Sequence, residues 1–366
     1  MDETLSQLQA LTARGGRVVM TTLVETRGTS PKKEGAKMWV GEDGRVLGAV
    51  TIGGCVDGRV VAESEAVLES GAPRLLEMAL GDEDAWELGL SCGGTVELLV
   101  EPLELGRGGA IARAYERVAA EVAAGRAVCL ARRLDSPGAA LLLLEGGASE
   151  GTLGDPALDA LALERAPALL ARGTSQAASL GEGPGRRVFF EVHAPLARLV
   201  IVGAGHASMP LVSLGKVLGF HTTVVDARPR LATRDRFPDA GELRVGIASE
   251  IVAQLALDSK SALVLTVHDY KVEVPVLRAA LQTRVGYVGM LGNRRRGKGV
   301  LDLLREQGVP EAELARVHVP IGLDLGAQSA AEIALSIVAQ IVALRAGKST
   351  GSLAEAKTRS AEGAPR

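Results

Sequence analysis

One strand, turn and helix in the second half of the chain constrains the fold more than any other feature. The apolar stretch 199–202 leads into Gly203-Ala204-Gly205-His206, and a helix is expected at 206–218. Glycines at such a turn let the backbone approach a phosphate held at the helix N-terminus. The following sequence alternates apolar strands with expected helices, and this alternation predicts a doubly wound parallel sheet. The further strands are HTTVVDAR, SALVLTV and GYVGML, and the further helices are expected at 273–283, 294–307 and 329–346.

The end of the second strand carries a candidate nucleotide ligand. Asp226 follows Gly205 by 21 positions, close to the ~20 that separate a glycine turn from the carboxylate that binds a ribose hydroxyl. A carboxylate here favours NAD over NADP, because it would repel a 2′-phosphate, although Arg228 weakens that preference. We therefore expect Gly203, Gly205, Asp226 and Arg228 to contact a dinucleotide. A Rossmann-like fold that binds no nucleotide is the alternative.

Histidines and arginines near the strand ends add further candidates. His206 could face the phosphates or be a polar surface group. His268 and Asp269 follow the strand SALVLTV at the sheet edge where ligands bind in this architecture, or they cap a turn. Arg294-Arg295-Arg296 is the only tight basic run. It is either a solvated helix start or a contact for a phosphate or a partner.

The first half of the chain predicts a mixed α and β domain. Short β-branched or alternating apolar runs indicate strands, and alanine- and leucine-rich runs with helical spacing indicate helices. The cut near 193–197 gives a first domain at 1–194 and a Rossmann-like domain at 195–346. Segment 174–187 is expected to be a turn or loop, and the polar tail 347–366 to be disordered. Strands are expected at 17–24, 37–40 and 95–103, and helices at 56–70, 109–124 and 156–172.

Two cysteines beside paired glycines are candidates for chemistry. Gly53-Gly54-Cys55 precedes the expected helix at 56–70, whose N-terminal dipole stabilises a thiolate. The glycines leave the backbone bare for a large planar or anionic ligand. Cys92-Gly93-Gly94 repeats the pattern before a strand. Each cysteine is alternatively a small buried residue, and Cys129, inside an apolar strand, is expected in the core.

Composition excludes several classes of protein. The 366 residues carry a net charge of −3, which gives no reason to expect binding to nucleic acid or to an anionic membrane. The N-terminus does not resemble a secretory signal and no apolar run is long enough to span a bilayer, so we expect a soluble cytoplasmic protein. Residues 1–190 contain no histidine, so we expect no structural zinc in the first domain.

An ordered series of motifs resembles the XdhC/CoxI family over roughly residues 15–346. The resemblance is specific because the motifs occur in sequence order across both expected domains, although Asp57 stands where many family members carry glutamate. The first-domain motifs are Gly28-Thr29-Ser30-Pro31, Thr51-Ile52-Gly53-Gly54-Cys55-Val56-Asp57 and Cys92-Gly93-Gly94. The second-domain motifs are Gly203-Ala204-Gly205-His206, Val225-Asp226-Ala227-Arg228, Arg236-Phe237-Pro238, His268-Asp269, Tyr287-Val288-Gly289 and Pro320-Ile321-Gly322-Leu323-Asp324.

The resemblance implies a factor that binds molybdenum cofactor as cargo. It further implies sulfuration of the cofactor with a cysteine desulfurase and delivery to an apo molybdenum hydroxylase of the xanthine dehydrogenase or carbon monoxide dehydrogenase type. Cys55 is then expected to contact the cofactor or its molybdenum, and the glycines with Asp57 and Cys92 to surround it. The role of a nucleotide such as NAD(P) in the second domain stays open, and a homodimer is the default expectation.

Two other functions remain as alternatives. The first is an NAD(P)-dependent oxidoreductase in which His206 or His268 serves acid–base chemistry and Cys55 redox chemistry. The second is a regulatory protein that binds nucleotide without catalysis. The sequence specifies no hydride acceptor site, so an accessory protein ranks before a turnover enzyme.

Overall fold

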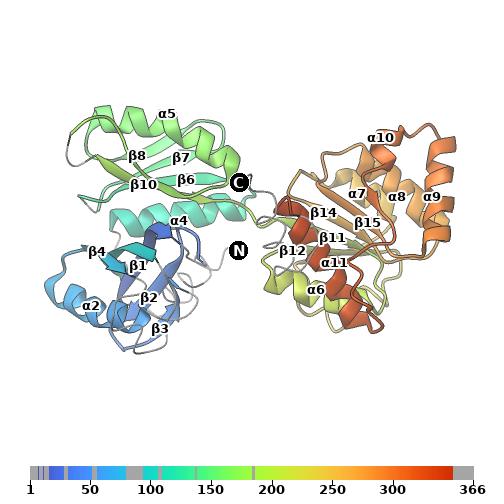
Figure 1. The fold of residues 1–366 in the computed structure, drawn as a ribbon, viewed down its shortest axis with the longest axis horizontal. Coiled ribbons are helices and arrows are strands. Elements are labelled where there is room, and N and C mark those ends of the chain that lie inside the picture. Colours follow the sequence, from blue (N-terminus) through green and yellow to red (C-terminus); the bar gives the residue numbers. More distant parts are fainter. Residues whose placement is uncertain are drawn as a thin grey trace, which may run out of the picture. The chain divides into compact units, whose positions relative to one another are not determined.

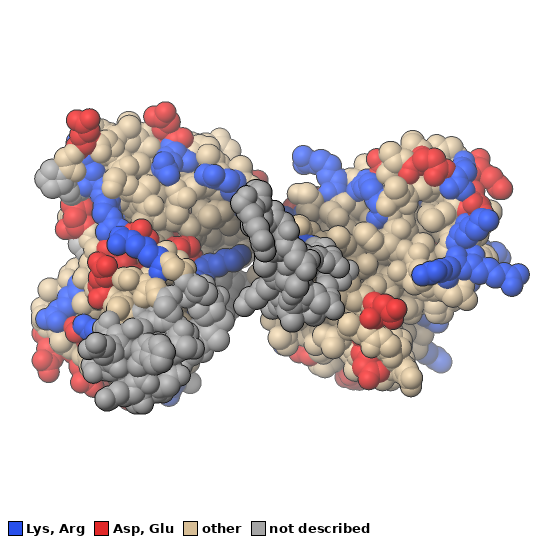
Figure 2. Space-filling model, viewed as in Figure 1, with Lys and Arg blue, Asp and Glu red and all other residues tan. Residues whose placement is uncertain are grey.

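The computed structural model describes residues 7, 11, 16–28, 32–51, 56–79, 94–105, 109–136, 138–183 and 186–348. The chain divides into two compact units, Met1–Pro195 and Leu196–Arg366, which are described separately. Figure 2 shows acidic and basic side chains interspersed on the visible face of each unit, in keeping with the small net charge. The expected disorder of the tail concerns residues of which only 347 and 348 are described.

Two antiparallel sheets form the first unit (Figure 1). Sheet A has the order β3-β2-β1-β5-β4, and sheet B has the order β8-β7-β6-β10-β9. The strands of sheet A are β1 (Gly16–Gly28), β2 (Lys37–Gly41), β3 (Val46–Gly48), β4 (Arg74–Ala79) and β5 (Gly94–Leu105). The strands of sheet B are β6 (Val128–Arg133), β7 (Ala140–Leu144), β8 (Ser149–Thr152), β9 (Gln176–Ser179) and β10 (Arg187–His193).

Among the described residues of this unit, three helices cover the faces of the sheets. Helix α2 (Asp57–Ser70) packs on sheet A through Val60 and Val67, and α5 (Pro156–Arg172) packs on the outer face of sheet B. Helix α4 (Ala110–Ala123) contributes Tyr115 to a core cluster shared by the inner faces of both sheets. The central strands therefore bury both faces: Val18 and Met20 of β1 lie in the shared core, whereas Val19 and Leu23 lie in the core beneath α2.

The expected loop at 174–187 is wrong in part, because it contains β9. This strand pairs antiparallel with β10, from Arg187 opposite Ser179 to Phe190 opposite Gln176. Its sequence, QAAS, has little intrinsic β-propensity, so the pairing with β10 at the sheet edge decides the conformation.

The second unit is a six-stranded parallel sheet in the order β13-β12-β11-β14-β15-β16. Residues of β11 alternate between its faces: Leu199 and Ile201 pack with α6 and α11, whereas Val200 and Val202 pack with α7, α8 and α9. The predicted doubly wound parallel fold is confirmed. The strands are β11 (Arg198–Val202), β12 (His221–Asp226), β13 (Glu242–Val245), β14 (Ala262–Leu265), β15 (Tyr287–Met290) and β16 (Val317–His318). The helices are α6 (Ser208–Val217), α7 (Ala248–Gln254), α8 (Tyr270–Leu281), α9 (Arg294–Glu306), α10 (Glu311–Leu314) and α11 (Ala330–Arg345).

Candidate functional sites

A cavity of about 630 Å³ lies where the carboxyl ends of β11, β12 and β14 meet. Its volume falls within the ~300–1,000 Å³ typical of small-molecule sites, and its position matches the crevice where open α/β sheets bind ligands. The structure thus brings most of the second-domain candidates together. Those that line it are Gly203, Gly205, Asp226, Arg228, His268 and Asp269.

The absence of a side chain at Gly203 and at Gly205 has a different structural reason at each position. Gly203 has φ +115°, and a Cβ there would lie 2.6 Å from Thr266 Oγ1 and 2.8 Å from Val267 Cγ1. The fold itself therefore requires glycine at 203. A Cβ on Gly205 would meet no atom within 4 Å, although the residue lines the cavity. The bare backbone at 205 leaves room for a ligand instead of a neighbouring side chain.

The carboxylate of Asp226 holds the turn and Arg228 in place. Its Oδ2 accepts hydrogen bonds from Ala204 N–H at 2.7 Å and from Arg228 Nη2 at 2.8 Å. Its Oδ1 accepts from Arg228 N–H at 2.8 Å and from Arg228 Nε at 2.9 Å. Burial alone would raise the pKa of Asp226, but these hydrogen bonds hold it below its usual value. The hydroxyls of a ribose would therefore have to share the Asp226 carboxylate with these donors or displace them.

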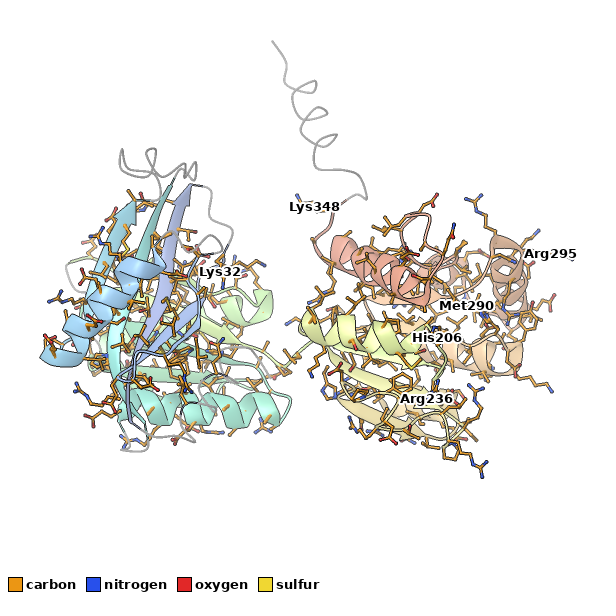
Figure 3. All side chains as sticks on the ribbon, turned by 90° about the horizontal axis from the view of Figure 1, so that it is seen from below. Lys32, His206, Arg236, Met290, Arg295 and Lys348 are labelled. Carbon is orange, nitrogen blue, oxygen red and sulfur yellow. The ribbon has the colours of Figure 1, made fainter. Side chains whose placement is uncertain are left out.

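The histidine candidates differ in position. His206 is exposed at the turn before α6 (Figure 3) and is not among the residues that line the cavity. His268 is exposed and does line it. Asp269 lines the cavity and also caps α8, because its carboxylate accepts a hydrogen bond from Lys271 N–H at 2.9 Å. The capping role proposed for this pair therefore holds for Asp269.

The basic run of α9 is split among three surroundings. Arg294 borders a separate cavity of about 460 Å³ beyond β15 and β16. Arg295 projects outward from the helix (Figure 3). Arg296 pairs with the fully buried Glu273, Nη2 to Oε2 at 2.7 Å. Burial raises the pKa of Glu273, and the Arg296 charge opposes this. The run therefore does not act as one surface patch.

In the first unit, Gly53, Gly54, Cys55, Cys92 and Gly93 lie outside the residues that the structure describes. The described residues beside them can nevertheless be placed. Gly94 opens β5 opposite Gly28, the last residue of β1. By strand direction, β2 begins and β3 ends at this same end of sheet A. The connections that carry the three first-domain motifs are therefore attached to one end of one sheet.

Lys32 joins two of these connections. Its Nζ donates a hydrogen bond to Ala49 O at 2.8 Å, and its charge acts on Asp57. Burial raises the pKa of Asp57, whereas a hydrogen bond with Thr51 and the charge of Lys32 act against this rise. Asp57 Oδ1 is buried without a hydrogen-bond partner among the described residues. Thr51 and Asp57 lie on either side of residues 52–56 in the chain, so the Gly-Gly-Cys segment lies in sequence between two polar described residues.

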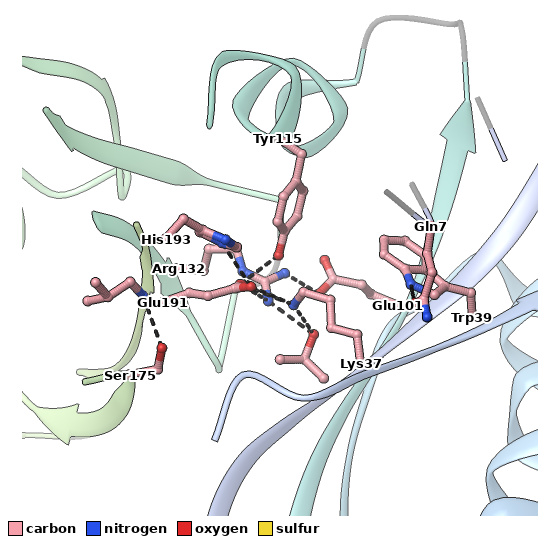
Figure 4. Close-up of polar contacts among 11 residues, drawn as sticks. Gln7, Lys37, Trp39, Glu101, Tyr115, Arg132, Ser175, Glu191 and His193 are labelled. Carbon is pink, nitrogen blue, oxygen red and sulfur yellow. Dashed lines mark hydrogen bonds and ion pairs between the residues drawn. The ribbon is translucent and has the colours of Figure 1, made fainter. Parts of the chain in front are cut away.

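Sequence reasoning missed a buried ion cluster between sheets A and B (Figure 4). Glu191 on β10 is its centre: Lys37 Nζ lies 3.1 Å from its carboxylate oxygens, Tyr115 Oη donates to it at 2.6 Å and His193 Nε2 lies 3.0 Å away. Arg132 Nη2 lies 3.7 Å from Glu191, and Arg132 also pairs with Glu101. All these side chains are at most 5% exposed.

Burial and pairing act against each other in this cluster. Burial alone would raise the pKa of Glu191, but Lys37, His193 and Arg132 hold it well below its usual value. Burial lowers the pKa of Lys37 to about 8, although Glu191 opposes the shift. Burial raises the pKa of Tyr115 well above its usual value. The cluster therefore contains a stabilised carboxylate beside an ammonium group that holds its proton weakly.

Two models of known protein families match this chain. A family model described as "XdhC Rossmann domain" matches residues 199–341, and one described as "XdhC and CoxI family" matches residues 11–79. The chain belongs to the XdhC and CoxI family. Both units therefore carry family sequence, as the motif series predicts.

Sequence similarity to individual proteins extends over most of the chain. A probable xanthine dehydrogenase subunit of Bacillus subtilis is 27% identical over 93% of this chain and 97% of its own length. The "Molybdenum cofactor insertion chaperone PaoD" of Escherichia coli is 27% identical over 90% of this chain and 84% of its own. A crystal structure described as a xanthine dehydrogenase from Bacillus halodurans has a TM-score of 0.76 and 27% identity, covering 95% of this chain and 97% of that one.

Two features are absent from the described part of the chain. No helix there combines the length and apolar character needed to cross a bilayer. Nor do three or more His, Cys, Asp or Glu side chains of the described residues gather where they could hold a metal ion. The tentative molybdenum ligand Cys55 is not among those residues.

Proposed function

We propose that this protein is a maturation factor that binds molybdenum cofactor and supports its sulfuration and its insertion into a xanthine dehydrogenase- or CO dehydrogenase-type molybdenum hydroxylase. The observation that carries the proposal is the similarity to the insertion chaperone of E. coli over 90% of this chain. The attachment of all three first-domain motifs to one end of sheet A supports it, because a cofactor held by several loops needs those loops to be neighbours.

Cys55 is the proposed contact to molybdenum, and Gly53, Gly54, Cys92 and Gly93 are proposed to surround the cofactor. A thiolate is a soft ligand that suits a transition metal, and bare glycine backbone admits a planar pterin. Asp57 and Gly94 border this region among the described residues. The proposed partners are the apo hydroxylase and a cysteine desulfurase, with a homodimer as the default assembly.

The second unit is proposed to bind a nucleotide, with NAD(P) as the first candidate. The free space at Gly205 and the volume of the cavity support it. When bound, a nicotinamide would supply hydride chemistry. Gly203 and Gly205 would face the pyrophosphate, and Asp226 with Arg228 would lie beside the adenosine ribose. A nucleotide bound there could regulate the protein, stabilise its fold or take part in recognition of the pterin cofactor.

The test is purification from cells that make molybdenum cofactor, followed by assays of bound pterin and molybdenum. The wild-type protein and Cys129→Ser should carry both, and Cys55→Ser should carry much less. A partner hydroxylase produced with Cys55→Ser should be folded yet poor in cofactor or unsulfurated. Full hydroxylase activity without this chain would refute the proposal. Stoichiometric NAD(P)H turnover on a small substrate would favour the oxidoreductase alternative instead.

A further inference from the structure

A second cavity, of about 280 Å³, opens beside the buried ion cluster in the first unit. It lies between the β1–β2 connection, the end of β10 and Ser175. We call it the lysine pocket and define it by Lys32, Lys33, Lys37, Ser175 and His193. Two of its lining groups, Lys37 and His193 (Figure 4), have side chains at most 2% exposed. The pocket therefore reaches into the core.

The distribution of lysine in the sequence singles out this pocket. Lys32, Lys33 and Lys37 are the only lysines among residues 1–195, where arginine occurs 16 times, and all three line it. His193 is the only histidine of that part of the chain and lines it too. Lysine offers a compact charge with rotatable donors, whereas arginine offers a planar fork, so the two are not equivalent binding groups.

Lysine cations outnumber carboxylates around this pocket, since Lys32, Lys33 and Lys37 line it together with Glu34 and Glu191. The carboxylate of Glu34 already accepts from Thr26 Oγ1 at 2.7 Å, and that of Glu191 is engaged by Lys37 and Tyr115. Ser175 Oγ accepts from Val192 N–H at 3.0 Å, which leaves its own O–H to donate. The side chain of Lys33 forms no hydrogen bond or ion pair with any residue described. An anionic ligand would therefore balance the excess of one lysine charge around the pocket and meet the free donors of Lys33 and Ser175.

Size and position restrict the ligand further. The volume is below the ~300–1,000 Å³ of sites that enclose a whole small molecule, so the pocket suits one end of a larger one. Lys32 lies between this pocket and the connections at Ala49 and Asp57. If one end of a ligand occupies the pocket, the rest of the ligand would therefore extend toward the end of sheet A that carries the first-domain motifs.

We propose that the lysine pocket binds the phosphate end of the pterin cofactor, through Lys32, Lys33 and the Ser175 hydroxyl, with Lys37 and His193 as its floor. The identity of the ligand rests on the proposed function, whereas the phosphate site rests on the pocket alone. The class of ligand is a pterin phosphate monoester, or the diphosphate that joins the pterin to a nucleotide.

Lysine-acetylation footprinting read by mass spectrometry tests the phosphate site, with sodium pyrophosphate as the probe. We expect pyrophosphate to slow acetylation of Lys32 and Lys33 and to leave the exposed Lys260 unchanged. Lys271 reports separately on the cavity of the second unit. Lys33→Ala should weaken pyrophosphate binding at this site at least about tenfold, the value of one charge-assisted hydrogen bond. Arg165→Ala, which removes an exposed cation from α5 of the same unit, should not.

The outcomes separate the two proposals. Unchanged acetylation of Lys32 and Lys33 at pyrophosphate concentrations that protect Lys271 would overturn the lysine pocket as a phosphate site. Protection of Lys33 in a protein that carries no pterin when purified would keep the phosphate site and overturn the cofactor as its ligand. Loss of bound pterin in Lys33→Ala, with retention in Arg165→Ala, would support both.

Discussion

Lys37 on β2 and Glu191 on β10 form a buried ion pair although 154 positions separate them in the chain. The pair joins sheet A to sheet B, and Tyr115 of α4 donates to the same carboxylate. Removing one partner of such a pair leaves an uncompensated charge in a medium that solvates it poorly. The integrity of the first unit should therefore depend on Glu191.

Glu191→Gln should lower the free energy of unfolding of the first unit by about 3–5 kcal/mol, because it leaves the buried Lys37 without its ion-pair partner, whereas Arg132 keeps Glu101. Urea titration followed by circular dichroism measures the change. Glu150→Gln is the matched control, since its ion pair with Arg117 is largely exposed and should contribute less than about 1 kcal/mol. Equal effects of the two substitutions would contradict the assigned importance of burial.

Acid should remove the advantage of Glu191 over glutamine. The folded-state pKa of Glu191 lies well below its usual value, so its contribution is fully present above about pH 4.5 and is lost as pH falls through the folded pKa. The difference in unfolding free energy between wild type and Glu191→Gln should thus shrink from pH 6 toward pH 3. A difference that stays constant over this range would mean that the carboxylate charge is not what stabilises the cluster.

Substitutions at the two glycines of the nucleotide turn should have different effects, one on stability and the other on nucleotide binding. Gly203→Ala forces a Cβ against Thr266 and Val267 at a positive φ, so we expect a loss of about 2 kcal/mol or more in stability. Gly205→Val should change stability by less than about 1 kcal/mol and should block nucleotide binding sterically. Thermal denaturation and calorimetry with NAD(H) and NADP(H) measure the two effects. Undiminished binding by Gly205→Val would show that no ligand approaches the turn.

Cys129 should be inert toward thiol reagents, because it is 1% exposed and burial raises its pKa to about 12. Cys55, which follows two glycines at an expected helix start, should have a pKa below the ~8.5 of a free cysteine and react quickly. Labelling rates against pH for single-cysteine variants compare the two thiols. A fast Cys129 with an unreactive Cys55 would reverse the assignment.

The second unit could be predicted from sequence because its information is local. Each buried strand of a parallel sheet is a short apolar run, each helix follows directly, and the glycine turn lies between the two. The same locality explains the candidates Gly203, Gly205 and Asp226, which lie at strand ends and therefore meet at one edge of the sheet. What the sequence left open was their use: only the structure shows that Asp226 already accepts hydrogen bonds from Ala204 and Arg228.

Tertiary structure alone decided the buried ion cluster and the lysine pocket. Lys37, Arg132 and Glu191 each occur in a strand where alternation permits either face to be solvent-exposed, and a charge usually indicates the exposed one. The only hint was compositional: three lysines confined to 32–37 and a first histidine at 193. Their convergence depends on the packing of two sheets from distant parts of the chain. The pattern along one strand predicts which residues share a face, but not whether solvent or another sheet covers that face. The covering element determines whether a charged side chain is solvated or paired.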